Sequence, residues 1–475
     1  MFFRRIKTPG IAHNAYMIGN GGTAAVIDPR RDVDEYLAIA RANGLTIRYV
    51  VETHRQEDFV AGSAALRGIA GAAIIGGDHA LFGHADRRLK EGEELDLSGL
   101  RLRALATPGH TPESTSWAVF VPGCPGGAWG VFTGDALFVG DTGRTDLPDP
   151  RATAENAGLL YDSARAKIFP LGDQTLLFPA HGAGSACGRH IAPRDDSTLG
   201  LEKLVNPVWR MSRADFMAHK QAERIPRPPY FSLMERVNLD GGRPADLSAD
   251  RVRVLQPEDF VAQSRHGLVI DTRPPEAFAG GHVPRAYSIW LAGLSSFAGW
   301  VADDAAPVYL ILEDPAQLET AVAALARIGI DRVEGFLAGG FASWRDAGLP
   351  IVTTGTVDAV DLARDLPCYG VLDVREVGEY EEGHIEGAVN VYVGDLERCA
   401  DELAHRLPRD RPVAVVCSVG HRASLGVSIL QRLGYRRVHN LLGGMTAWGA
   451  LEAGGHRETN ARLPADVSTT TTCPT

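Results

Sequence analysis

Thr53-His54-Arg55-Gln56-Glu57-Asp58-Phe59 is the first of four short polar clusters that decide the fold of the N-terminal half of the chain. Each cluster follows a β-forming run and combines small turn residues with a side chain that can bind metal. The other three are Thr107-Pro108-Gly109-His110-Thr111, Thr133-Gly134-Asp135-Ala136 and Pro179-Ala180-His181-Gly182. Imidazoles and a carboxylate at strand ends can converge on one ion, as the facial triad of Fe(II) or, with a water, as a Zn(II) site. Taken alone, each histidine is better explained as an ordinary surface or core residue.

The order T-H-x-x-x-D, P-G-H-T, T-G-D-A and P-A-H-G resembles the metallo-β-lactamase fold, an αββα sandwich. More specifically, the chain resembles the persulfide (sulfur) dioxygenase branch of that family. The stretches that carry this closer resemblance are Thr133-Gly134-Asp135-Ala136-Leu137-Phe138, Gly143-Arg144-Thr145-Asp146 and Asn206-Pro207. The resemblance implies one Fe(II) per chain, held by His54, His110 and Asp135, with Asp58 and His181 orienting these ligands or binding metal themselves.

The chain departs from the H-x-H-x-D-H motif of this family at two positions. The second histidine is Gln56 and the last is Phe59. A two-metal hydrolase would need both imidazoles, so their loss argues against a dinuclear zinc site. Three alternatives stay open: a mononuclear iron site, a zinc-dependent thioester hydrolase, and a metal-free domain that only binds or assembles.

The second half of the chain contains an internal repeat of about 100 residues. Asp271-Thr272-Arg273 corresponds to Asp373-Val374-Arg375, and Gly339-Gly340 with Trp344 corresponds to Gly443-Gly444 with Trp448. This period is too long for a solenoid and predicts two copies of one small domain. Buried apolar strands alternate with helical runs in each copy, which predicts a parallel sheet covered on both faces.

A thiol loop follows the apolar strand pattern at residues 412–416 in the last copy. It reads Cys417-Ser418-Val419-Gly420-His421-Arg422 and leads into a helical run. Backbone N–H groups at such a turn, together with the charge of Arg422, favour a thiolate, a persulfide or an oxyanion. The loop resembles the C-x-x-G-x-R loop of rhodanese sulfurtransferases across residues 356–455, which implies that Cys417 carries sulfur and Arg422 supports it. A phosphatase is the alternative within that fold.

The first copy of the repeat lacks this thiol. Aligned by sequence, Glu313 takes the place of Cys417, and a carboxylate cannot carry persulfide sulfur. We therefore expect a non-catalytic, rhodanese-like domain that has a structural or docking role. In the first half, Cys187 is a possible sulfur relay, and Ser185 and Arg144 are possible substrate-binding residues.

Composition and charge limit the functional classes. The 475 residues carry a net charge of −11, which disfavours binding to nucleic acid, and no apolar run approaches the ~20 residues that cross a bilayer. The start of the chain has no secretion signal pattern, and the six cysteines include no CxxC pair. We expect a cytoplasmic protein that has no membrane partner and that assembles as a homo-oligomer.

These observations predict an α/β multidomain protein. The expected parts are a metallo-β-lactamase-like domain at 1–245, a rhodanese-like domain without the cysteine at 250–355, a rhodanese domain at 356–460 and a flexible tail at 461–475. The leading functional hypothesis is an enzyme that oxidises a low-molecular-weight persulfide, such as glutathione persulfide, to sulfite with O₂ and also transfers sulfur between thiosulfate and thiols. The alternatives are sulfur transfer alone and a zinc-dependent thioester hydrolase.

Overall fold

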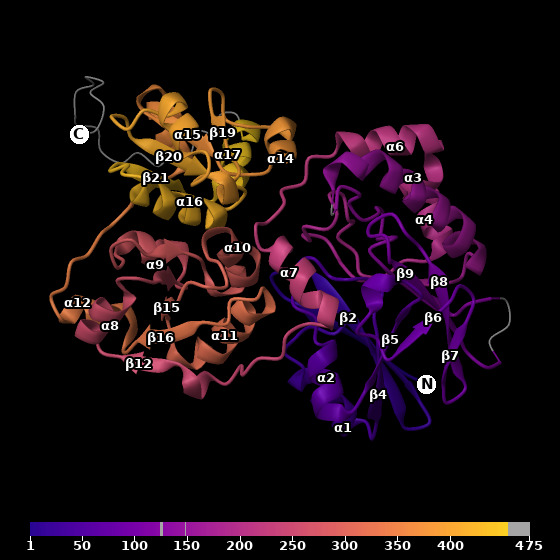
Figure 1. Ribbon diagram of the computed structural model, residues 1–475. Helices are drawn as coiled ribbons and strands as arrows, with labels where there is room; N and C mark the ends of the chain where they lie inside the picture. The colour runs from indigo at the N-terminus through magenta and orange to yellow at the C-terminus, as the bar shows by residue number, and fades with distance from the viewer. Residues whose placement is uncertain (124–126, 148, 455–475) are drawn as a thin grey trace. The chain divides into compact units, whose positions relative to one another are not determined.

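The computed structural model describes residues 1–123, 127–147 and 149–454, so the tail predicted at 461–475 lies outside the described residues. The chain divides into two compact units, one comprising Met1–Leu247 with Val322–Asp331 and the other Ser248–Ala321 with the residues from Arg332 onward (Figure 1). Among the described helices, none is long and apolar enough to span a bilayer.

The first unit is built on two sheets. The first sheet has six strands in sequential order: β1 (Phe2–Thr8), β2 (His13–Asn20), β3 (Thr23–Ile27), β4 (Thr46–Val51), β5 (Ala73–Gly77) and β6 (Arg87–Leu89). The second has the order β11-β10-β9-β8-β7, with β7 (Glu94–Leu97), β8 (Leu100–Ala106), β9 (Thr115–Phe120), β10 (Gly130–Gly134) and β11 (Leu176–Pro179). Strands β3 to β6 run parallel, as do β10 and β11, and the remaining neighbours in these sheets are antiparallel.

Three apolar layers hold this unit together. The central layer lies between the sheets and includes Trp117, Phe132 and Phe178. The outer face of the first sheet packs against α1 (Asp34–Ala42) and α2 (Ser63–Ala70), and the outer face of the second packs against α3 (Thr153–Ser163) and its neighbours. The helices that follow are α4 (Leu199–Val205), α5 (Pro207–Arg210), α6 (Arg213–Ala222) and α7 (Phe231–Val237). This helix–sheet–sheet–helix order confirms the predicted αββα sandwich.

The second unit contains two parallel five-stranded sheets of the same topology. One has the order β12-β16-β15-β13-β14, with β12 (Arg253–Leu255), β13 (Leu268–Asp271), β14 (Tyr287–Ser288), β15 (Val308–Ile311) and β16 (Val333–Leu337). The other has the order β17-β21-β20-β18-β19, with β17 (Gly355–Val357), β18 (Gly370–Asp373), β19 (Val389–Asn390), β20 (Val413–Val416) and β21 (Val438–Leu441). All described pairings in both sheets are parallel, which confirms the prediction from the repeat.

Helices connect the parallel strands of each copy. The first copy has α8 (Pro257–Ser264), α9 (Pro275–Gly280), α10 (Leu294–Val301), α11 (Leu318–Arg327) and α12 (Gly340–Asp346). The second has α13 (Ala359–Asp365), α14 (Val377–Glu382), α15 (Ala400–Arg406), α16 (His421–Arg432) and α17 (Gly444–Ala453). In both copies the D-x-R motif is an ion pair next to the sheet: Arg273 binds Asp271, and Arg375 binds Asp373.

Strand register corrects one alignment of the two copies. Asp271 pairs with Ile311 in one sheet, and Asp373 pairs with Val416 in the other. The residue that takes the place of Cys417 is therefore Leu312, not Glu313, because Leu312 directly follows Ile311 as Cys417 directly follows Val416. Leu312 is buried and cannot carry sulfur, so the first copy still lacks the thiol.

Gly444 allows α17 to begin against the Cys417 loop. Its φ is +53°, and a Cβ there would lie 2.1 Å from the Cys417 carbonyl oxygen. The Met445 N–H donates to that same oxygen, so helix and loop are joined directly. A side chain at position 444 would force them apart.

Gly444→Ala is expected to destabilise this domain by ~1 kcal/mol or more, because alanine is strained at positive φ and clashes with backbone. Hydrogen exchange of the peptides that cover β20 and α16 in the full chain measures the effect. Gly449→Ala is the matched control in the same helix, since its Cβ would meet nothing within 4 Å. Equal protection in the two variants would contradict this account of the helix–loop contact.

Candidate functional site

Four loops at strand ends bring the predicted metal-site residues together in the first unit. His54 follows β4, His110 follows β8, Asp135 follows β10 and His181 follows β11. All four side chains are at most 2% exposed. Gly134 is required beside Asp135, because its φ is +53° and a Cβ there would lie 2.5 Å from Thr53 Oγ1.

His54 is anchored through one ring nitrogen. Its Nδ1 lies 2.8 Å from Thr53 Oγ1, whose hydroxyl donates to the Asp28 carboxylate. Nδ1–H therefore donates to Thr53, and Nε2 carries the lone pair toward the centre of the site. Burial lowers the pKa of His54 to about 3 and raises that of Asp28 to about 7. A neutral imidazole with a free Nε2 is the form that binds metal.

His110 is anchored in the same way. Its Nδ1 donates to the Arg144 carbonyl oxygen at 2.8 Å, which leaves Nε2 directed at Asp135. Burial alone would lower the pKa of His110, but the charges of Asp135 and Glu57 outweigh it and raise the pKa to about 9. A proton or a cation is therefore favoured at this point.

The ligand atoms of the predicted triad converge. Asp135 Oδ2 lies 3.4 Å from His110 Nε2 and 3.8 Å from His54 Nε2. Among the described residues, none offers these three atoms a hydrogen-bond partner. Burying such groups unpaired is costly, and a bound cation removes that cost. The residues present therefore fit one metal ion.

His181 connects Asp135, a residue of the triad, to Asp58. His181 Nδ1 is 2.8 Å from Asp135 Oδ1, and Nε2 is 2.9 Å from Asp58 Oδ2. Burial lowers the pKa of His181, but the two carboxylates outweigh it and raise the pKa well above its ordinary value. In the absence of metal, one ring nitrogen of His181 thus holds Asp135 and the other holds Asp58.

The two residues that depart from the family motif point away from the centre. Gln56 Nε2 lies 3.4 Å from the anchored Nδ1 of His54, on the outer side of that ring. Phe59 is fully buried and packs on His13, with ring centroids 4.2 Å apart. Neither supplies an atom to a second metal ion.

Arg144 has a structural role rather than the substrate-binding role expected from the sequence. It is almost fully buried and pairs with Asp146, and it donates to the carbonyl oxygens of Ala186, Ile225 and Pro226. These bonds use all five of its N–H donors and fix the proline-rich segment against the site. Its guanidinium therefore has no donor left for a substrate.

Cys187 and Ser185 belong to the loop after His181. The Cys187 backbone N–H donates to Ser185 Oγ, and the thiol is 1% exposed beside Phe138 and Ile191. Burial and nearby carboxylates raise the pKa of the Cys187 thiol well above its ordinary value, so it is a neutral thiol. A relay role for Cys187 stays a prediction.

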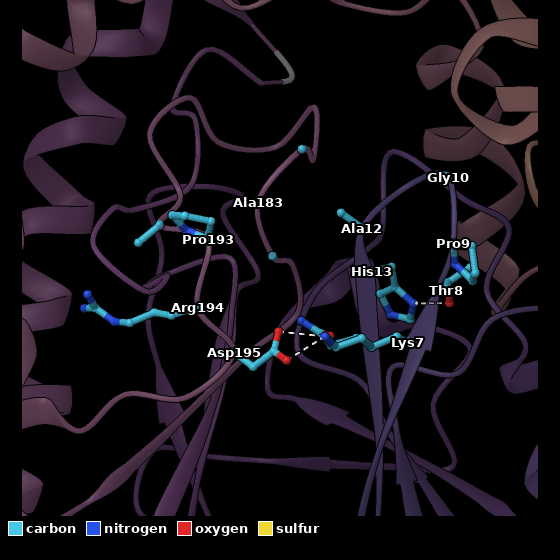
Figure 2. Close-up of a pocket in the computed structure, with 14 residues that line it drawn as sticks. Lys7, Thr8, Pro9, Gly10, Ala12, His13, Ala183, Pro193, Arg194 and Asp195 are labelled. Atoms are coloured by element: carbon cyan, nitrogen blue, oxygen red, sulfur yellow. Dashed lines mark hydrogen bonds and ion pairs between the residues drawn. The ribbon is translucent and has the colours of Figure 1, made fainter. Parts of the chain in front are cut away.

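A pocket of about 520 Å³ opens next to His181. Its wall comes from the β1–β2 turn, from the start of β2 at His13, and from two loop segments around Gly182 and Pro193 (Figure 2). His13 Nδ1 bonds Thr8 Oγ1 at 3.1 Å, and its ring lies 5.6 Å from that of His181. Lys7 and Asp195 form an ion pair in the wall.

In the second unit, Cys417 lies directly after β20 and is 1% exposed. The Gly420 N–H donates to Cys417 Sγ at 3.1 Å. Arg422 donates to both carboxylate oxygens of Glu379 on α14, at 2.6 and 2.7 Å, and to Ser418 Oγ. The positive charge of Arg422 is thus paired, and the residue shapes the loop. Glu379 carries no signal in the local sequence, because its role depends on a contact between distant residues.

Comparison with known proteins identifies the parts of the chain. Residues 8–181 match the metallo-beta-lactamase superfamily, and residues 256–347 and 356–451 each match the rhodanese-like domain. Over 236 residues the chain is 36% identical to a hydroxyacylglutathione hydrolase of Anaeromyxobacter dehalogenans (strain 2CP-C), covering 44% of this chain and 86% of that protein. The chain belongs to the metallo-beta-lactamase superfamily.

The chain is also similar to other proteins and to a solved structure. It is 26% identical over 245 residues to "Persulfide dioxygenase ETHE1, mitochondrial" of Bos taurus, covering 51% of this chain and 89% of that protein. A crystal structure of a metallo-beta-lactamase from Staphylococcus aureus subsp. aureus COL matches at a TM-score of 0.62 and 28% identity, covering 71% of this chain and 99% of that one. The persulfide dioxygenase relatives and the rhodanese-like domains together indicate an enzyme of sulfur metabolism.

Asp146→Asn is expected to destabilise the first unit by ~1–2 kcal/mol at neutral pH, because charged hydrogen bonds to Arg144 are lost. Burial raises the pKa of Asp146, but Arg144 outweighs it and holds the pKa below its usual range. The contribution of Asp146 is therefore present above the unfolded pKa of ~3.9 and is lost as pH falls through the lower folded pKa.

Thermal unfolding of the full chain at neutral pH and near pH ~3 tests this pair, since the gap between wild type and variant should shrink in acid. Asp149→Asn is the control, because Asp149 is an exposed aspartate that bonds Arg151 at the surface. A gap that stays constant with pH would contradict the assignment.

Proposed function

We propose that the N-terminal domain is a persulfide dioxygenase with one Fe(II) ion, and that the C-terminal domain is a sulfurtransferase that acts through Cys417. The observation that carries the first part is the convergence of His54 Nε2, His110 Nε2 and Asp135 Oδ2, all buried and without hydrogen bonds in the described residues. The persulfide dioxygenase relatives support the same reaction.

His54, His110 and Asp135 would hold the ion. Ferrous iron bound by two imidazoles and a carboxylate supplies open positions for sulfur and for O₂. The balanced reaction consumes a persulfide R–S–SH, O₂ and one water, and it yields the thiol R–SH, sulfite and two protons. The outer sulfur is oxidised, the S–S bond breaks and O₂ is reduced.

The chain's own residues prepare this site. Asp58 and His181 hold Asp135 so that only Oδ2 faces the centre. Thr53 and the Arg144 carbonyl fix the tautomers of the two ligand imidazoles. Burial excludes bulk water, and the pocket beside His13 is of a size that accepts a small thiol carrier such as glutathione.

A hydrolase with two metal ions is disfavoured, although hydroxyacylglutathione hydrolases are among the relatives. Such an enzyme needs imidazoles where this chain has Gln56 and Phe59, and it needs a free nitrogen on His181. Both ring nitrogens of His181 are bound to carboxylates instead. A single-ion site is therefore the better match to these residues.

The Cys417 loop is built for sulfur transfer. The Cys417 thiolate attacks the outer sulfur of thiosulfate, the S–S bond of thiosulfate breaks, and sulfite leaves with the electron pair. An acceptor thiolate then removes the sulfur from the Cys417 persulfide. The Gly420 N–H supports the negative sulfur, and the Arg422–Glu379 pair keeps the loop in shape. One chain that carries both sites raises the effective concentration of each product at the other site.

His110→Ala is expected to remove most of the bound iron and to abolish persulfide-dependent O₂ uptake, because one of three ligands is lost. Metal analysis after anaerobic Fe(II) loading and an oxygen electrode measure the two effects. Thiosulfate:cyanide sulfur transfer should persist. His79→Ala is the control, because His79 caps a short helix in the same unit, outside the site.

The outcomes of this experiment separate the alternatives. Full iron and O₂ uptake in the His110 variant would rule out the triad. A wild-type chain that holds no metal and transfers sulfur would mean sulfur transfer alone. Zinc, with thiol release from an acyl-glutathione and no O₂ uptake, would mean a thioester hydrolase.

Cys417→Ser is expected to abolish thiosulfate:cyanide sulfur transfer and to leave iron content and O₂ uptake unchanged, because a hydroxyl cannot carry sulfane sulfur. Cys399→Ser is the matched control, since Cys399 is a free thiol in the same domain. Sulfur transfer that persists in the Cys417 variant would show that this thiol does not carry the transferred sulfur.

A further inference from the structure

A second buried carboxylate, that of Glu57, lies beside the triad. Glu57 lies in the same turn as His54 and is 0% exposed. Its Oε2 is 3.3 Å from His110 Nε2, and one ligand atom each from His54, Glu57 and His110 lie within 4.8 Å of one another. Neither carboxylate oxygen of Glu57 has a hydrogen-bond partner in the part of the chain that the structure describes.

The spacing around Glu57 matches that of ligands on one ion. Atoms bound at ~2.0–2.2 Å to the same metal lie roughly 3–3.6 Å apart at right or tetrahedral angles. The measured separations from His110 Nε2 are 3.3 Å to Glu57 Oε2 and 3.4 Å to Asp135 Oδ2. Glu57 thus belongs to the same set of atoms as the triad.

The neighbours of Glu57 leave its carboxylate incompletely compensated. Arg55 Nη2 lies 3.7 Å from Oε1, beyond hydrogen-bond reach, while Glu113 adds negative charge nearby. The inner oxygen, Oε2, faces His110. A cation at the inner oxygen would stabilise the ionised form of this buried carboxylate.

We propose that Glu57 is a fourth protein ligand of the metal ion, which makes the site one of two imidazoles and two carboxylates. This proposal rests on the proposed metal centre and changes its chemistry in two ways. Two carboxylates balance the charge of a divalent ion, which favours hard ions such as Fe(II) or Mn(II) over Cu(I). On a six-coordinate ion, two positions rather than three stay open, one for sulfur and one for O₂.

The altered motif has a consistent explanation in this site. Gln56 contacts His54 and Phe59 packs on His13, so neither position offers the imidazole that a two-metal site would need. Glu57 stands between them and adds a ligand to the first ion. In this proposal, the turn lacks the imidazoles that a second ion would need and supplies an additional carboxylate to the first ion.

Glu57→Gln tests the proposal, because the amide keeps the volume of the side chain and removes its charge. The metal-free full chain is titrated with Co(II), a spectroscopic probe, in competition with a chelator. The affinity is expected to fall by at least about 100-fold, and the visible d–d bands are expected to change with the ligand set. Glu113→Gln, which alters the neighbouring buried carboxylate, is the matched control and should keep the wild-type affinity and spectrum.

Wild-type affinity and an unchanged Co(II) spectrum in Glu57→Gln would overturn the proposal. If circular dichroism shows that Glu57→Gln is unfolded, Glu57→Asp takes its place. This substitution keeps the negative charge but shortens the side chain. The affinity of Glu57→Asp should fall by about tenfold, and an unchanged value would count against the proposal. Because metal binding is read without turnover, Glu57 can pass this test even if the Fe(II)-loaded chain consumes no O₂ with a persulfide.

Discussion

The orientation of two buried imidazoles is the constraint on which the N-terminal site depends. His54 and His110 each donate Nδ1–H to a protein oxygen, so each must present Nε2 to the same small volume. The carboxylate of Asp135 completes that volume, and the surrounding sandwich keeps it dry. These groups would be unstable together without a proton or a cation among them. The metal chemistry proposed for this chain follows from that instability, since the protein has already arranged the donor atoms.

The same arrangement bears on how many ions the proposed site would hold. His181 bonds Asp135 and Asp58 through its two ring nitrogens. Burial lowers the pKa of His181, but the two carboxylates outweigh burial and raise that pKa well above its ordinary value, so a proton on this ring offsets part of their charge. Phe59 fills the position of a lost imidazole by packing on His13.

In the second unit, both copies of the repeat share the features that stabilise the fold, and only the second copy has the reactive thiol. Both copies keep the parallel sheet and the D-x-R ion pair, which serve the fold. Only the second copy has a sulfur atom after the central strand, with the Gly420 N–H directed at it. The first copy contributes contacts instead: Ser288 Oγ bonds Ser424 Oγ on α16, the helix that follows the Cys417 loop. A copy without the thiol can thus support the one that has it.

Local sequence determined much of this protein. The repeat and the buried strand pattern predicted the two parallel sheets and the Cys417 loop, because strand faces, tight turns and loop glycines depend on neighbouring residues. The sandwich was predicted from the family resemblance that the four polar motifs carry. Other features were decided by tertiary structure. The donors of Arg144 are used by carbonyl groups some 40 to 80 residues away, and Arg422 is paired by Glu379 from another helix. Leu312 rather than Glu313 takes the place of Cys417 because strand register, not residue count, aligns the copies. Glu57 gave no signal in the sequence beyond its charge, since only folding brings its carboxylate to His110, more than 50 residues further along the chain.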